Sequence, residues 1–254
     1  MKNPRIYLDQ PIVVGENTPL SDDAFGHVIR VLRLKQGDNL TLFNGLTRDG
    51  LGTEYQAKLI NVSKKHAEVA IEDMVKVINE SPLRIHLGQG ISRGDRMDYT
   101  LQKSVELGVN TITPLFSSRC TVKLSGERLA KKISQWQKIV ISACEQSGRC
   151  IVPIVQPAIS LEQWLTQKTT ALKLNLHPKA QYSIMGMPDT AFSDLQKKSI
   201  RLLIGPEGGL NNTEILAANQ HNFLDVLLGP RVLRTETAAL TALTALQCRF
   251  GDMN

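Results

Sequence analysis

Apolar and polar side chains alternate with two different periods along this chain, and the change falls near residue 77. Before that point, apolar positions recur every second residue, which is the period of β-strands. The runs with this period cover residues 39–43, 55–62 and 67–71. A helix is predicted over 22–34, because Ser21 is a good N-cap and aspartates follow it. The first 76 residues are therefore predicted to form a small β-rich domain.

Beyond a predicted linker at 79–82, short apolar strands alternate with amphipathic helices. The predicted strands are 83–87, 111–116, 171–176, 200–204 and 224–228, and the predicted helices are 95–107, 127–147, 213–221 and 235–249. A further short helix is expected after Ser160, which forms a capping-box sequence with Gln163. Such alternation is typical of a mostly parallel sheet covered by helices on both faces. We therefore expect an α/β domain over residues 77–254.

Composition limits the kind of protein. A chain of 254 residues with 42% apolar content is long enough for two domains with buried cores. Its four cysteines lack Cys-x-x-Cys spacing, so we expect reduced thiols and neither a metal site nor disulfides. No apolar run approaches the roughly 18 residues of a membrane span, and the N-terminus lacks the apolar core of a signal peptide. The expected location is cytoplasmic, with no membrane partner.

Excess positive charge is confined to the second segment. The whole chain has a formal charge of +6, whereas residues 1–76 hold 10 basic and 10 acidic side chains. This excess makes a polyanion such as RNA a reasonable partner, although a modest positive charge is also common in proteins that bind no nucleic acid. Within the first segment, His27, Arg30 and Arg33 recur along one side of the predicted helix. That stripe is either an RNA contact or an ordinary solvated helix face.

Two strands near the C-terminus each run into a glycine-containing loop. The first loop is Gly205-Pro-Glu-Gly-Gly209, and the second begins with Gly229-Pro230. Ligands of open α/β sheets bind where strands end and loops begin. Neither loop matches the Walker pattern or G-x-G-x-x-G, so a nucleotide held mainly by its phosphates is not expected. The pair predicts a shared ligand site, although an ordinary turn would explain either loop alone.

These loops and other motifs resemble the RsmE family of SPOUT-class RNA methyltransferases, which methylates N3 of a uridine in small-subunit ribosomal RNA. The motifs are Pro4-Arg-Ile6, His27-Val-Ile-Arg-Val-Leu-Arg33, Ser92-Arg-Gly94, Gln102-Lys-Ser-Val-Glu-Leu-Gly108, Glu145-Gln-Ser-Gly-Arg149, Leu174-Asn-Leu-His177, Gly205-Pro-Glu-Gly-Gly209 and Leu228-Gly-Pro-Arg-Val-Leu-Arg-Thr-Glu-Thr-Ala-Ala239. They follow the family's order along the whole chain, so the set is far more specific than any single motif. Residues 179–198 carry no such motif.

The resemblance implies a C-terminal SPOUT-type trefoil-knotted α/β methyltransferase domain with a parallel sheet, at 77–254, and a small N-terminal PUA-like RNA-binding β-barrel domain, at 1–76. General topology rules would exclude such a knot. The resemblance also implies S-adenosyl-L-methionine as cofactor and a uridine in the decoding region of 16S rRNA, within the small ribosomal subunit, as target. It implies a homodimer through the C-terminal domain in which each active site borrows residues from its partner. Apolar residues surround most of the circumference of the final helix, so it must be buried either within the chain or against a second copy.

The residues expected to hold the cofactor lie at strand ends and in the two loops. They are Leu176, His177, Ile204, Gly205, Glu207, Gly208, Gly209, Leu228, Gly229, Leu233, Arg234, Thr235 and Ala238. Backbone groups and apolar side chains of this kind suit the enclosure of adenine. Glu207 has two possible roles, a bond to the cofactor or a cap on the following helix.

Arg234 is the expected catalytic side chain, because a guanidinium keeps its charge and directs paired donors at an oxyanion forming on uracil. It could instead hold an RNA phosphate. Glu145 and Glu236 are the candidate general bases, His177 is less favoured, and water is a further alternative. The side chains expected to bind RNA are Arg5, Arg30, Arg33, Arg93, Lys103, Arg119 and Arg149.

Two other functions stay open at this point. One is an RNA-binding ribosome assembly factor without catalysis, against which the intact cofactor loops argue. The other is a related methyltransferase that acts on another RNA or on a ribose hydroxyl, since the fold alone does not fix the acceptor atom.

Overall fold

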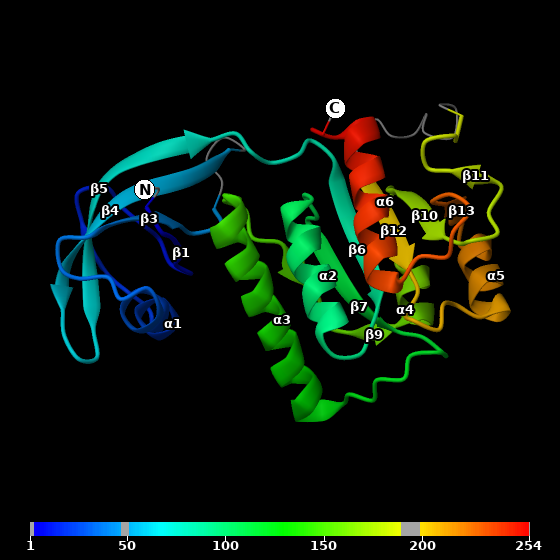
Figure 1. Ribbon diagram of the computed structural model, residues 1–254, viewed down its shortest axis with the longest axis horizontal. Helices are drawn as coiled ribbons and strands as arrows, with labels where there is room; N and C mark the ends of the chain where they lie inside the picture. Colours follow the sequence, from blue (N-terminus) through cyan, green and yellow to red (C-terminus); the bar gives the residue numbers. More distant parts are fainter. Residues whose placement is uncertain (1–2, 47–50, 189–198, 254) are drawn as a thin grey trace. The chain divides into compact units, whose positions relative to one another are not determined.

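The computed structural model describes residues 3–46, 51–188 and 199–253. It divides into two compact units (Figure 1). The N-terminal unit consists of Met1–Glu80 and Cys144–Val152, and the C-terminal unit consists of Ser81–Ala143 and Pro153–Asn254. The chain thus first leaves the N-terminal unit inside the predicted linker. The short return at 144–152 falls in the segment that the sequence assigns to the second domain.

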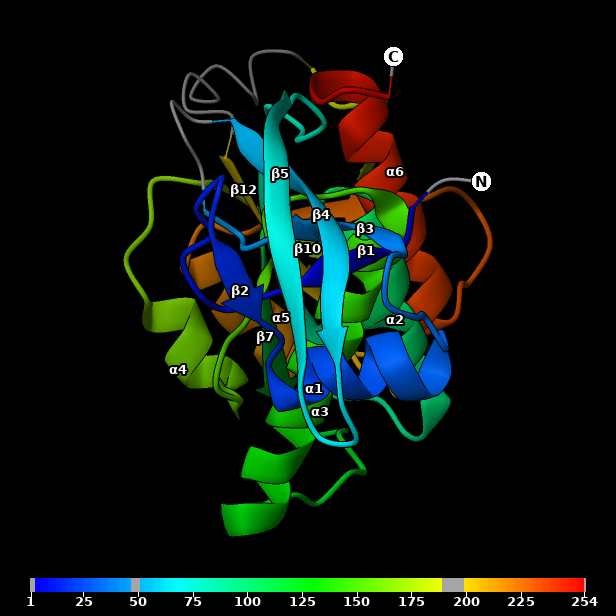
Figure 2. The ribbon, with the colours of Figure 1, turned by 90° about the vertical axis from the view of Figure 1, so that its left-hand side faces the viewer.

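The N-terminal unit is built on a five-stranded sheet. Its strands are β1 (Arg5–Tyr7), β2 (Asn17–Pro19), β3 (Asn39–Phe43), β4 (Gly52–Val62) and β5 (Ala67–Val77). They lie in the order β1-β3-β4-β5-β2, with β1 parallel to β3 and the other pairs antiparallel. Figure 2 shows β4 and β5 as a long curved hairpin, and two register shifts along this pair increase its bend and twist. The three predicted strands are confirmed, whereas β1 and β2 are too short to leave a periodic pattern.

The helix predicted after Ser21 is confirmed and has two parts. α1 (Asp22–Phe25) begins where the Ser21 hydroxyl accepts a hydrogen bond from Ala24 N at 3.3 Å. It continues as η1 (Gly26–Val31), a π-helical stretch. The apolar side chains of both parts pack into one core with side chains of β3, β4 and β5. Burial of this face holds the helix against the curved sheet.

Two buried arginines hold the returning segment in the N-terminal unit. The Arg5 guanidinium donates to Glu54 Oε1 at 2.8 Å, to Cys144 O at 2.6 Å and to Arg149 O at 3.2 Å. Arg149 in turn forms an ion pair with Glu80 at 2.6 Å. A buried guanidinium is costly unless its donors are satisfied. These contacts therefore fix the position of the returning segment against β1 and β4.

The C-terminal unit is built on a parallel sheet. Its strands are β6 (Arg84–Gly90), β7 (Thr111–Phe116), β8 (Ile154–Val155), β9 (Ile159–Ser160), β10 (Leu172–Leu176), β11 (Tyr182–Ser183), β12 (Ser199–Ile204) and β13 (Leu224–Leu227). Their order is β11-β13-β10-β12-β6-β7-β8, with β9 also beside β7, and every pair among these strands is parallel. The predicted parallel architecture is confirmed.

Helices cover both faces of this sheet (Figure 1). They are α2 (Asp95–Glu106), α3 (Gly126–Ser147), α4 (Leu161–Thr166), α5 (Asn212–Gln220) and α6 (Thr235–Phe250). Two successive residues of β6 face opposite helices. Gly88 faces Trp164 of α4, whereas Gln89 bonds to Thr235 of α6 on the other face of the sheet. The capping box predicted at Ser160 is confirmed. None of the helices in the described part of the chain has both the length and the hydropathy of a membrane span.

A cluster of polar side chains, of which Thr113 and Arg201 are buried, lies between the sheet and α4. His86 Nε2 is 2.7 Å from Thr113 Oγ1, and the His86 ring meets Trp164 edge-on, with centroids 5.5 Å apart. The Arg201 guanidinium lies 4.1 Å from the centroid of the Trp164 ring. Burial, with the charge of Arg201, lowers the pKa of His86 to about 4. His86 is therefore neutral in the folded protein near neutral pH.

Acid is expected to destabilise the fold through His86. The pKa of His86 is about 4 when folded, against an ordinary value of 6.5, so the unfolded state binds more protons between these values. The free energy of unfolding should therefore fall as the pH drops from 6.5 to 4, by roughly 3 kcal/mol in all. Urea titrations across this window should give a shallower pH dependence for His86→Gln than for the native protein. Equal slopes would contradict the assignment to His86.

Candidate functional site

A pocket of about 860 Å³ opens at the carboxyl ends of the strands in the C-terminal unit. It is bounded by the ends of β10, β12 and β13, by the loops at 205–210 and 228–234, and by the start of α6. Every residue expected to hold the cofactor lines it: Leu176, His177, Ile204, Gly205, Glu207, Gly208, Gly209, Leu228, Gly229, Leu233, Arg234, Thr235 and Ala238. The two glycine loops emerge at the same edge of the sheet because β12, β10 and β13 are adjacent and parallel.

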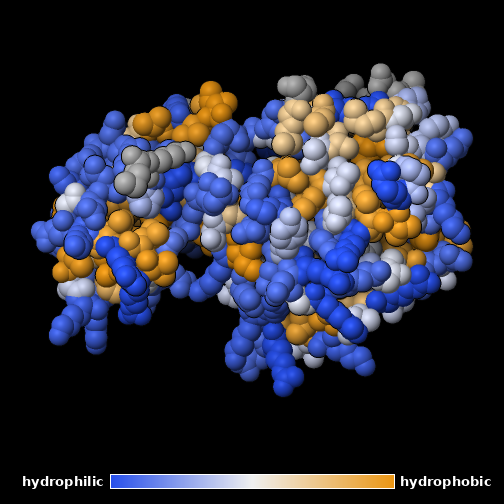
Figure 3. Space-filling view, viewed as in Figure 1, coloured by the Kyte–Doolittle hydropathy of each residue, from blue (hydrophilic) through white to orange (hydrophobic). Residues whose placement is uncertain are grey.

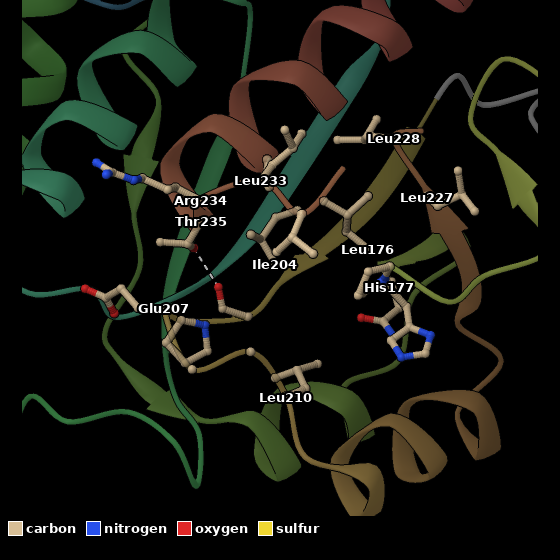
Figure 4. Close-up of a pocket in the computed structure, with 18 of the residues that line it drawn as sticks. Leu176, His177, Ile204, Glu207, Leu210, Leu227, Leu228, Leu233, Arg234 and Thr235 are labelled. Atoms are coloured by element: carbon tan, nitrogen blue, oxygen red, sulfur yellow. Dashed lines mark hydrogen bonds between the residues drawn. The ribbon is translucent and has the colours of Figure 1, made fainter. Parts of the chain in front are cut away.

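The centre of the pocket is apolar and its two ends are polar. Figure 4 shows Leu176, Ile204 and Leu233 gathered around the central space. His177 lies at one end, and Glu207 and Arg234 lie toward the opposite side (Figure 4). An apolar centre with polar groups at its ends suits a ligand that has a flat, weakly polar body and charged extremities.

The first glycine loop is fixed to the start of α6 by a hydrogen bond. Thr235 Oγ1 donates to Gly205 O at 2.6 Å, the dashed line in Figure 4. Below this loop, Gly90 ends β6 so close to Pro206 that an added Cβ would lie 2.4 Å from Pro206 N. Only glycine allows this approach, because the nearest atom belongs to the backbone.

Glu207 ties the glycine loop to the segment that begins α2. Its Oε1 accepts a hydrogen bond from Arg93 N at 2.8 Å and another from Arg96 Nη1 at 3.3 Å. The alternative role as a cap on the next helix is wrong, because the side chain of Asn211 caps α5 in a capping box with Glu214. The carboxylate therefore stabilises the loop, whichever groups of a ligand it also meets.

Arg119 holds the same loop from another direction. Its Nη1 donates to Gly208 O at 2.9 Å, and a Cβ added to Gly208 would lie 3.0 Å from the Arg119 Cβ. Arg119 was expected to bind RNA. In this structure its side chain lines the pocket and already bonds to the backbone of the glycine loop.

At the other end of the pocket, polar side chains of β10 meet β13. His177 Nδ1 is 3.9 Å from Asp225 Oδ2, and Asn175 Nδ2 donates to Asp225 Oδ1 at 2.7 Å. Asn175 and Asp225 are also register partners in the sheet. Asp225 thus organises this end through Asn175 of β10 and His177, the residue after that strand.

The three side chains expected to act in catalysis differ in their surroundings. Arg234 is exposed, lines the pocket and occupies the N-cap position of α6. Glu236 does not line the pocket, and its Oε2 is buried with no hydrogen-bond partner among the described residues. Glu145 belongs to the N-terminal unit, where it accepts a hydrogen bond from Tyr7 N at 3.0 Å and pairs with His27 at 3.4 Å. Burial raises the pKa of Glu145.

The side chains expected to bind RNA also differ in their surroundings. Arg30, Arg33 and Arg93 are exposed, and Lys103 pairs with Glu106 on α2. Arg5 and Arg149 are only 7% and 5% exposed, and their guanidinium groups bond to acceptors within the N-terminal unit. Their position gives these two a structural role that counting positive charges does not reveal.

Two further arginines, Arg96 and Arg231, line the pocket and were not among the expected site residues. Arg96 lies two residues after the motif Ser92-Arg-Gly94, and Arg231 lies within the motif that begins at Leu228. These positions in or beside motifs could have identified the two arginines from the sequence. With Arg119 and Arg234 they give the pocket a strongly positive lining.

Comparison with known proteins assigns both units to described families. Residues 79–247 match the family model of an RNA methyltransferase domain, and residues 20–72 match that of an RNA methyltransferase PUA domain. The chain is 38% identical to the ribosomal RNA small subunit methyltransferase E of Buchnera aphidicola from Acyrthosiphon pisum, over 99% of this chain and 95% of that protein. It is 31% identical to the protein of the same name in Bacillus subtilis, over 93% and 92%.

Solved structures give the same result. A putative methyltransferase from Legionella pneumophila, in complex with the cofactor SAM, has a TM-score of 0.92 and 44% identity and covers 99% of this chain and 100% of its own. A ribosomal RNA small subunit methyltransferase E from Neisseria gonorrhoeae bound to S-adenosyl methionine has a TM-score of 0.88 and 41% identity, with the same coverage. These similarities support the expected SPOUT-type α/β fold with a PUA-like N-terminal domain.

Replacement of Gly90 by Ala should weaken ligand binding at the pocket, because the new Cβ must displace the backbone at Gly205 and Pro206. Isothermal titration with S-adenosylmethionine measures the loss, which we expect to exceed roughly tenfold in Kd, or more than 1.4 kcal/mol.

Gly88→Ala is the matched control. Its added Cβ would collide with the ring of Trp164 on α4, and neither Gly88 nor Trp164 lines the pocket. That variant should lose thermal stability but bind in its folded fraction. Equal affinities for Gly90→Ala and the native protein would show that the loop can move without loss of function.

Proposed function

This chain belongs to the ribosomal RNA small subunit methyltransferase E family, and from that premise we propose that it methylates N3 of a uridine in the decoding region of 16S rRNA. Its cofactor is S-adenosylmethionine. The observation that carries the proposal is the convergence of both glycine loops and Arg234 on one pocket. The rest of this section concerns the acceptor atom, the residues that act on it and the assembly.

The pocket fits S-adenosylmethionine in size and in chemistry. Its volume of about 860 Å³ is within the usual range for ligand sites. Leu176, Ile204 and Leu233 would enclose the adenine, and the backbone of the two loops would supply hydrogen bonds to it. When bound, the cofactor supplies an activated methyl group on a positively charged sulfur.

Arg234 is proposed to stabilise the uracil as it becomes a nucleophile. Removal of the N3 proton spreads negative charge over the two adjacent carbonyl oxygens. A guanidinium at the pocket wall can direct two N–H donors at such an oxyanion and keeps its charge at any physiological pH. Arg234 is exposed at the N-cap of α6, so its guanidinium is accessible to a base that enters from solvent.

We assign the N3 proton to water rather than to a side chain. Glu236 does not line the pocket, Glu145 is held within the N-terminal unit by Tyr7 N and His27, and Glu207 is engaged by Arg93 and Arg96. Nearby positive charge favours the ionised form of an acid, so the arginine lining lowers the pKa of a bound uracil. A strong protein base is then unnecessary.

RNA binding is proposed to involve exposed arginines of both units. Arg30 and Arg33 in the N-terminal unit, with Arg93 in the C-terminal unit, are exposed and suited to phosphate contacts. Arg5 and Arg149 are not proposed as RNA-binding residues, because their side chains are buried. The match of residues 20–72 to a PUA domain of RNA methyltransferases supports this use of the N-terminal unit. The target must be unpaired or flipped to present N3.

We also propose a cytoplasmic homodimer with the knotted topology of the SPOUT class. In Figure 3, apolar and weakly polar surface lies over the region of α6 in the C-terminal unit. Val232, just before α6, is 87% exposed, which is unusual for a large apolar side chain and suits burial by a second copy. The cytoplasmic location follows from ribosomal RNA as the substrate.

The acceptor atom can be tested in cells. Nucleoside mass spectrometry of 16S rRNA from a deletion strain should show loss of one 3-methyluridine, which a plasmid copy of this chain should restore. A missing ribose-methylated nucleoside would instead assign the acceptor to a hydroxyl. Unchanged rRNA methylation would favour the non-catalytic assembly factor and contradict the proposal.

Replacing Arg234 with Ala should reduce the single-turnover rate roughly 10²- to 10³-fold, with a much smaller effect on cofactor Kd. The reason is that its proposed partner is charge that develops mainly on the way to the transition state. Lys at this position should rescue only part of the rate, because it keeps the charge without the planar pair of donors. Recovery of the full rate at saturating RNA would make Arg234 an RNA-positioning residue instead.

A further inference from the structure

Gln89 is a fully buried polar residue close to the pocket but outside its lining. It lies near the end of β6, opposite Ile204 of β12 in the register of the sheet. Its Nε2 donates to Gly90 O at 3.1 Å and to Thr235 Oγ1 at 3.0 Å. Its Oε1 is buried and has no hydrogen-bond partner among the described residues.

The direction of these hydrogen bonds is fixed by the chemistry of the partners. The Thr235 hydroxyl has one proton, and Gly205 O at 2.6 Å can only accept, so that proton lies between them. Thr235 Oγ1 must therefore accept from Gln89. Gly90 O is also an acceptor, so the amide nitrogen faces both partners and the orphan atom is the amide oxygen.

The chain of bonds connects the end of β6 to two parts of the pocket, the start of α6 and the glycine loop. It runs from the end of β6, through the first residue of α6, to the first residue of the glycine loop. Thr235 follows Arg234 directly in the sequence. Any shift of Thr235 relative to Gly205 would move Arg234 relative to the glycine loop.

A fully buried amide oxygen without a partner lowers stability, and an apolar side chain of similar length would avoid that loss. Gln89 is therefore a poor choice for stability alone. We propose that Gln89 is a positioning residue for methyl transfer, which acts through Thr235 to hold Arg234 against the glycine loop. This inference rests on the proposed function, and specifically on the role of Arg234.

The test compares Gln89→Met with Thr235→Val and with the double variant. Met keeps the length of the side chain without its donors, and Val keeps the shape of Thr without its hydroxyl. For each variant, the single-turnover rate of methyl transfer to rRNA is measured at saturating cofactor, together with the cofactor Kd and the melting temperature. Ser104→Ala is the matched control, since the Ser104 hydroxyl is also buried without a partner but lies on α2 outside the pocket lining.

Gln89→Met should transfer methyl groups roughly 10- to 100-fold more slowly, because small misplacements of catalytic groups have effects of that size. Its melting temperature should be equal to or above that of the native protein, and its cofactor Kd should change less than about threefold. The double variant should be no slower than the slower single variant, because both changes break one chain of bonds. Thr235→Ser should lose less rate than Thr235→Val. The Ser104→Ala control should keep the native rate.

Three results would overturn the proposal: a native rate in Gln89→Met, a rate that falls only in proportion to lost folded protein, or effects of the two single variants that multiply in the double variant. The assay counts methyl groups transferred to rRNA, so its outcome does not depend on the acceptor atom. A native enzyme that methylates a position other than N3 would refute the proposed acceptor, while the rates of the variants would still decide the role of Gln89.

Discussion

The pocket depends on one constraint, the placement of β10 between β12 and β13 in a sheet whose strands all run in the same direction. Parallel strands end at the same edge, so the segments after them must meet there although they are far apart in sequence. This brings the residue after β10 to the glycine loop after β12 and to the loop after β13. The order of the strands therefore brings the pocket residues together, and a few contacts between the loops then fix their positions.

Those contacts are polar, and they occur where apolar packing would not specify a position. Apolar side chains pack without a preferred direction, whereas a hydrogen bond fixes one atom against another. Thr235 against Gly205 O, Glu207 against Arg93 N and Arg119 against Gly208 O each join the glycine loop to a different segment. The N-terminal unit uses the same device, since Arg5 joins β1 to the returning segment. In both units the buried or loop-binding polar groups determine register, and the apolar core supplies the stabilisation.

The sequence predicted the parts of the fold that depend on local pattern. Strands of five or more residues, the longer helices and the cap at Ser160 all leave periodic or capping signals, and the cofactor-loop residues followed from strand ends and from resemblance to a family. The two-residue strands β8, β9 and β11 leave no period to detect. Arg5 and Arg149 look like any exposed arginine in the sequence, because their burial depends on contacts between β1 and residues more than 130 positions later. Gln89 likewise shows as one polar residue in a strand, and only its contact with Thr235 reveals a role.

The charge of the pocket has a consequence for the proposed chemistry. Arg96, Arg119, Arg231 and Arg234 line it, whereas Glu207 contributes a carboxylate that already pairs with Arg96. The positive sulfur of the cofactor gains nothing from such a lining, although the cofactor's carboxylate can. In the proposed reaction, an ionised uracil would gain much more, because its negative charge is absent from the neutral base that first binds. The lining would then favour the state that reacts over the state that binds, which is the condition for faster turnover rather than tighter binding.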